Sequence, residues 1–119
     1  MNLLIRKTST GLIWTSLSYA LEPQFIGPIS EEVVFRGYFK KLFCLNGHFG
    51  WFAALVSSAL FGYMHGSNTL FEWLLYGGMS LGLYLSFRRR NQLIDSIALH
   101  IGNNLFVSIM QLLVYYGIL

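Results

Sequence analysis

Long apolar stretches separated by short polar turns constrain this chain more than any other feature of its sequence. Of its 119 residues, 55% are hydrophobic and 11% are charged, whereas a soluble domain has about 45–50% apolar and about 25% charged residues. A helix that crosses a bilayer needs about 20 mostly apolar residues, so about five spans are the most that this length allows. The sequence therefore predicts an all-α protein, a polytopic bundle of transmembrane helices.

Turn residues and helix-starting residues divide the chain into a first apolar segment and four further helices. The first segment, residues 11–26, is interrupted by Glu22 and Pro23, so a short span, a kinked span and an interfacial helix all remain open. A turn is expected near Gly27. The four helices are expected from Pro28 to about Leu45, from Gly50 to about His65, from Thr69 to about Phe87 and from Leu93 to the C-terminus.

Two parts of the chain follow from this layout. Residues 1–24 form an N-terminal segment, which is a candidate first transmembrane helix, and residues 25–119 form the core of the protein.

Basic residues gather in three short clusters, Arg6-Lys7, Lys40-Lys41 and Arg88-Arg89-Arg90. The formal net charge of +3 is small and scattered, which argues against a nucleic-acid partner and favours membrane lipids. Because Lys and Arg collect on the cytoplasmic side of a membrane, five spans would place all three clusters on that side. If the first segment does not cross, the N-terminal cluster changes side.

Charged residues inside the predicted helices need an explanation, because each costs at least about 2.5–3.5 kcal/mol at the centre of a bilayer. Arg36 shares a helix with Glu31 and Glu32. Glu32 and Arg36 are four residues apart, hence on one face, and are expected to form a structural ion pair. Glu31 is turned about 100° away and has no partner on its own helix.

Three further polar side chains lie in or at the ends of apolar helices. His65 ends one helix, while His100 and Asn104 lie four residues apart on one face of another. Each of them alone is often a residue that joins helices by a hydrogen bond. Together with the unpaired Glu31, at compatible depths in the membrane, they indicate a site that activates water.

Three motifs appear in order in these helices. Residues 31–36 (EEVVFR) look like an EExxxR signature, residues 61–65 (FGYMH) look like FxxxH, and residues 100–104 (HIGNN) look like HxxxN. In this order they resemble the CPBP family of intramembrane proteases, which groups type II CAAX prenyl endopeptidases with bacteriocin-processing and bacteriocin self-immunity (Abi) proteins. The resemblance covers about residues 25–110.

The resemblance implies an intramembrane endopeptidase in a multi-pass protein of a prokaryotic cell membrane, acting on a membrane-associated peptide or protein. Its implied catalytic residues are Glu31, which activates a water together with His65, and the pair His100 and Asn104, which holds the oxyanion of the tetrahedral intermediate. A carboxylate or imidazole base and preorganised hydrogen-bond donors suit that chemistry. Family members usually carry more helices ahead of the first motif, which makes substrate access and stability the properties to examine.

The resemblance leaves the need for a metal open. The chain has no HExxH motif, in which one helix supplies two zinc ligands and a base. A zinc site made of Glu31, His65 and His100, with an open position for water, is the second alternative after a metal-free mechanism. No other cofactor is implied.

Two other functions use the same polar groups. A non-catalytic membrane immunity or scaffold protein would bind a peptide or partner in the same groove, and an ion pathway would use the same ionisable side chains.

Overall fold

The computed structural model describes residues 2–43 and 50–119, and every regular element in these two ranges is helical. In chain order the elements are α1 (Asn2–Leu21), the π-helical η1 (Glu22–Ile26), α2 (Gly27–Glu32), the π-helical η2 (Val33–Tyr38), α3 (Phe39–Phe43), α4 (Gly50–Met64), α5 (Leu70–Arg90) and α6 (Leu93–Tyr115). The prediction of an all-α protein is confirmed, and the last three helices lie where the sequence placed them. The predicted end of the second helix at Leu45 lies outside the described residues.

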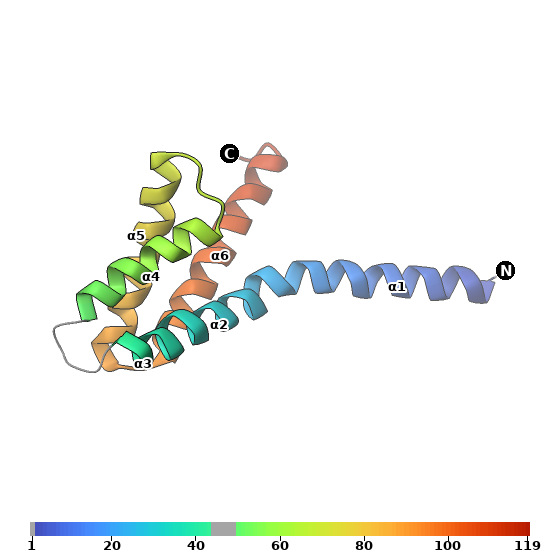
Figure 1. Ribbon diagram of the computed structural model, residues 1–119. Helices are drawn as coiled ribbons and strands as arrows, with labels where there is room; N and C mark the ends of the chain where they lie inside the picture. Colours follow the sequence, from blue (N-terminus) through green and yellow to red (C-terminus); the bar gives the residue numbers. More distant parts are fainter. Residues whose placement is uncertain (1, 44–49) are drawn as a thin grey trace.

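The first five elements form one uninterrupted helical run, from Asn2 to Phe43 (Figure 1). The predicted turn near Gly27 is therefore wrong: Ile26 and Gly27 both have right-handed helical backbone angles. Pro23 has no N–H and would interrupt a regular α-helix. The structure accommodates it in a wider turn, in which the Gly27 N–H donates to the Glu22 carbonyl, five residues back.

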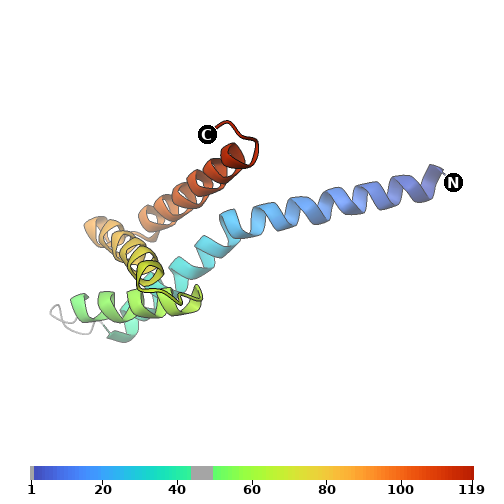
Figure 2. The ribbon, with the colours of Figure 1, turned by 90° about the horizontal axis from the view of Figure 1, so that it is seen from above.

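This continuous run changes the expected distribution of positive charge. Arg6-Lys7 and Lys40-Lys41 lie toward opposite ends of one helical run, which agrees with the alternative in which the N-terminal cluster changes side; the side on which each cluster lies stays a prediction. Helix α1 projects away from the other helices in two perpendicular views (Figures 1 and 2). The molecule is accordingly elongated, with extents of 66 × 31 × 26 Å.

The other helices pack around a small core. Helix α4 packs against α5, α5 packs against α6, and α6 contacts η1, α2 and η2. Small side chains on α4, including Ala54 and Ser57, are buried, and small residues let helices approach closely. The buried apolar residues are Phe35, Ala53, Ala54, Phe61, Leu83, Tyr84 and Phe87.

Most large apolar side chains face outward, from Trp14 in α1 to Val114 in α6. Among the described residues, α6 is the one helix that is both long and apolar enough to cross a bilayer, while the apolar α4 has only 15 residues. Only 6% of the most apolar window of α6 is buried, whereas the core helix of a soluble protein is covered by its neighbours. By length and composition, helix α6 is therefore a candidate membrane span; the polytopic arrangement stays a prediction.

Local signals determine where α5 begins and ends. The Thr69 hydroxyl accepts a hydrogen bond from the Glu72 N–H, and the Glu72 carboxylate accepts one from the Thr69 N–H, which is a capping box. At the other end Asn91 takes a left-handed conformation with φ 59°, as residues that stop helices do. Arg90 then pairs with Asp95 in the first turn of α6, which joins the two helices across the turn.

At Gly62, α4 packs directly against the side chain of Trp73 in α5. A Cβ at this position would lie 2.9 Å from Cε3 and 3.2 Å from Cζ3 of Trp73. We expect Gly62→Ala to lower the free energy of unfolding by about 1 kcal/mol or more, because the cost of overpacking exceeds the gain in helix propensity. Gly78→Ala is the matched control: its Cβ would meet nothing within 4 Å, so it should leave stability unchanged or raise it. Unfolding in mixed detergent micelles measures both, and equal effects would contradict the packing argument.

Candidate active site

A buried ion pair anchors the site. Glu32 is fully buried and Arg36 is 1% exposed, and Arg36 NH1 lies 3.1 Å from Glu32 Oε1. Arg36 NH2 also donates to the carbonyl oxygen of Ser80 at 2.6 Å and to its hydroxyl at 2.9 Å. These contacts join η2 to α5, and the ion pair lies where the spacing of four residues predicts it. Burying one charge without its partner would cost several kcal/mol, so the pair acts as a unit.

The same carboxylate orients His100, which is 2% exposed on α6. Nδ1 of His100 lies 3.0 Å from Glu32 Oε1, so its N–H donates to the carboxylate. The other ring nitrogen, Nε2, lies 3.7 Å from Glu31 Oε2. Glu32 therefore determines which edge of the imidazole faces Glu31.

His65, the first residue beyond α4, is held in a similar way. Its Nδ1 lies 2.8 Å from the carbonyl oxygen of Phe61, and its ring stacks between Phe61 at 4.2 Å and Tyr76 at 4.8 Å between centroids. With the Nδ1 proton directed at the carbonyl, Nε2 is free to accept and lies 4.0 Å from Glu31 Oε2. Aromatic packing on both faces limits the ring to this orientation.

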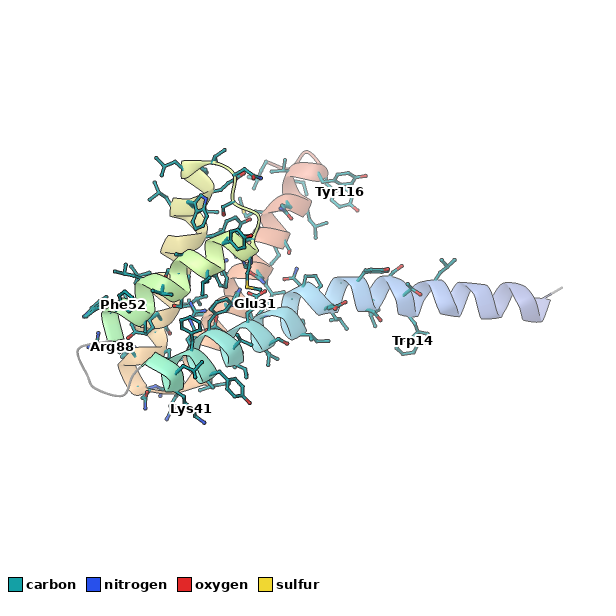
Figure 3. The ribbon with its side chains drawn as sticks, viewed as in Figure 1. Trp14, Glu31, Lys41, Phe52, Arg88 and Tyr116 are labelled. Atoms are coloured by element: carbon teal, nitrogen blue, oxygen red, sulfur yellow. The ribbon has the colours of Figure 1, made fainter. Side chains whose placement is uncertain are left out.

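Glu31 is the residue that both imidazoles face. Its side chain points into the space where α2, α4 and α6 meet (Figure 3), and its Oε2 is buried without a hydrogen-bond partner in the protein. The separations of 3.7 and 4.0 Å to the two Nε2 atoms are too long for direct hydrogen bonds.

Asn104 lines the same cavity as these three residues. Its Nδ2 donates to the carbonyl oxygen of Pro23 at 3.1 Å, a carbonyl that belongs to η1. The cavity has a volume of about 370 Å³ and is bounded mainly by η1, α5 and α6. Its lining residues are Pro23, Gln24, Gly27, Glu31, His65, Leu75, Tyr76, Met79, His100, Asn103, Asn104, Val107 and Ser108.

The donor geometry does not favour the zinc alternative. In the two described ranges no group of three or more His, Cys, Asp or Glu side chains is arranged to hold a metal ion. A tetrahedral zinc ion about 2.0–2.1 Å from each donor would bring the donors to about 3.3 Å from one another. The two His–Glu31 separations are wider, 3.7 and 4.0 Å.

Some residues of this site lie outside the three sequence motifs. Ser80 completes the hydrogen bonding of Arg36, Tyr76 covers His65, and Gln24 lines the cavity. Each is a polar or aromatic residue in an apolar stretch, which is a weak signal in sequence alone. Only the packing of η1 and α5 against the motif helices brings them to the site.

The chain is similar in sequence to a known family and to several known proteins. The profile of a family described as "Type II CAAX prenyl endopeptidase Rce1-like" matches residues 7–106. The chain is 38% identical over 95 residues to "UPF0177 protein YbdJ" of Lactococcus lactis, covering 77% of this chain and 37% of that protein. It is also 38% identical over 88 residues to "Putative membrane peptidase YdiL" of Bacillus subtilis, covering 73% of this chain and 34% of that protein.

These relatives are much longer than the region they share with this chain. A third, "UPF0177 protein YvdC" of Lactococcus lactis, is 36% identical over 83 residues, covering 69% of this chain and 31% of that protein. The chain thus spans about a third of the length of these three relatives. No solved structure matches the chain.

Proposed function

Because this chain belongs to the Rce1-like family of type II CAAX prenyl endopeptidases, we propose that it hydrolyses a peptide bond in a membrane-associated peptide or protein. The family and the name of YdiL point to a membrane protease. The family resemblance implies two roles, which are CAAX-type processing and the maturation or self-immunity of bacteriocins. We also propose that it is an integral, multi-pass protein of a prokaryotic cell membrane.

One observation carries the proposal: Glu31 Oε2 is buried, has no hydrogen-bond partner in the protein, and faces two imidazole Nε2 atoms. A water held between Glu31 and His65 would lose a proton to the carboxylate as its oxygen bonds to the scissile carbonyl carbon. The proton then passes from Glu31 to the leaving nitrogen as the C–N bond breaks. The products are a new carboxylic acid and a new amine, and transfer of the acid's remaining proton to the amine gives a carboxylate and an ammonium group.

His100 and Asn104 are the proposed donors to the tetrahedral oxyanion. With both ring nitrogens protonated, His100 donates from Nδ1 to Glu32, 3.0 Å away, and from Nε2 to the oxyanion. Asn104 keeps one amide hydrogen beyond the one directed at Pro23. Donors that are held in place before the reaction stabilise developing charge without reorganisation.

The proposal is tested with the purified protein in lipid vesicles and a fluorescent, farnesylated peptide ending in a CAAX sequence. In ¹⁸O-labelled water we expect cleavage, with one labelled oxygen in the new C-terminal carboxylate. Protein-free vesicles are the control, and mass spectrometry locates the label. Binding of the peptide without cleavage would contradict hydrolysis and favour the alternative of a non-catalytic immunity or scaffold protein.

A further inference from the structure

The cavity at Glu31 continues past the reacting groups along a second row of polar side chains. Ser108 lines it from α6, and Gln24 lines it from η1. The lining residues also include the apolar Leu75 and Val107. None of the proposed catalytic steps uses Gln24 or Ser108.

Gln24 has one hydrogen-bonding atom that is buried and unused. Its Nε2 donates to Ser108 Oγ at 2.6 Å, which sets the orientation of the carboxamide. Its Oε1 is buried and has no hydrogen-bond partner in the protein. A buried acceptor without a partner is costly, and π-helical turns such as η1 occur frequently at functional sites.

The row lies at a definite spacing from the reaction centre. Gln24 precedes Glu31 by seven residues and Ser108 follows His100 by eight, which correspond to about 10 Å and about 12 Å at a helical rise of about 1.5 Å per residue. An extended peptide advances about 3.3 Å per residue. The row therefore lies about three residues from the scissile bond of an extended substrate.

We propose that Gln24 is a substrate-binding residue, whose Oε1 accepts a backbone N–H of the substrate about three residues from the scissile bond. This inference rests on the proposed function. A peptide supplies an N–H at each residue whatever its side chains, whereas an acyl or prenyl chain supplies no donor. Ser108 is a positioning residue that holds the carboxamide with Oε1 free.

The test combines a substitution in the protein with a substitution in the peptide. Gln24→Met keeps the length of the side chain and removes the acceptor, and we expect kcat/KM for the farnesylated CAAX peptide to fall about fivefold to twentyfold, mostly through KM. N-methylation of one peptide amide near the scissile bond should lower kcat/KM of the wild type by a similar factor, and should lower kcat/KM of Gln24→Met only a little. Gln111→Met, the same change at an exposed residue of α6, is the matched control.

Binding measurements separate failure of this inference from failure of the proposed function. In the Glu31→Gln background, which holds the peptide without cleaving it, Gln24→Met should weaken peptide binding by the same factor. The wild type could cleave the peptide while each N-methylation lowers kcat/KM by the same factor for the wild type and for Gln24→Met. The inference is then overturned, and hydrolysis stands. If the wild type binds the peptide without cleaving it, the affinities of the wild type and of Gln24→Met are compared. Equal affinities overturn the inference, and weaker binding by Gln24→Met supports it. If the wild type neither cleaves nor binds the peptide, both the inference and the proposed function are overturned.

Discussion

Replacing Glu31 with Gln should lower kcat for peptide cleavage by about 10²- to 10⁴-fold, the usual contribution of a general base. The amide has nearly the same shape as the carboxylate but cannot accept the proton of the attacking water. The side chain faces both imidazoles, at 3.7 and 4.0 Å, and Gln fits the same space. We therefore expect KM and stability to change little. Steady-state cleavage of the farnesylated peptide in vesicles gives both constants.

Glu22→Gln is the matched control for this experiment. Glu22 is an exposed carboxylate at the start of η1, on the same helical run, so the same chemical change there should leave kcat within about twofold of the wild type, as for most surface substitutions. Equal activity of Glu31→Gln and the wild type would remove Glu31 from the mechanism. A loss of activity in both variants would indicate a general effect of charge.

Replacing Arg36 with Met should lower the free energy of unfolding by about 3–5 kcal/mol, the cost of leaving one member of a buried ion pair without its partner. The Glu32 carboxylate would stay buried with only the His100 N–H to compensate it, and the two acceptors of Ser80 would lose their donor. Because His100 is oriented by Glu32, activity should fall as well. Unfolding in mixed detergent micelles measures the stability.

Removing both charges together separates charge from packing. The double variant Glu32→Leu with Arg36→Met should be less destabilised than Arg36→Met alone, because no unpaired charge remains buried. Arg89→Met, at an exposed arginine of α5, should change stability by no more than about 0.5 kcal/mol. If the double variant is the least stable of the three, the ion pair does not act as a unit.

The helices of the second half of the chain were predictable because their signals are local. Apolar stretches end at Gly66, which has φ +69°, and at Asn91, two residues that take left-handed conformations readily. The run through Gly27 was not predictable in the same way. Proline and glycine near each other are typical of a turn, but they also fit a helix that widens by one residue to pass Pro23.

The contacts of the candidate site also fall into two groups, those that local spacing predicts and those between distant residues. The spacing of four residues on one helix predicts the Glu32–Arg36 pair, and the lack of a partner singles out Glu31. The hydrogen bond from His100 to Glu32 joins residues 68 positions apart, and no local pattern indicates it. The hydrogen bond from Gln24 to Ser108 joins residues 84 positions apart, and no local pattern indicates it either.

The amino-acid sequence by itself determined that this protein is helical, rich in apolar surface, and supplied with one carboxylate that has no partner on its own helix. Those properties depend on composition and on spacings within single helices. Only the tertiary structure decided that the N-terminal segment continues straight into the helix of the first motif, and that Glu32, rather than Glu31, orients His100. The first depends on the backbone of η1, which carries the helix past Pro23 and Gly27. The second depends on how distant helices pack, because the rotation of one helix against another selects which polar edges meet.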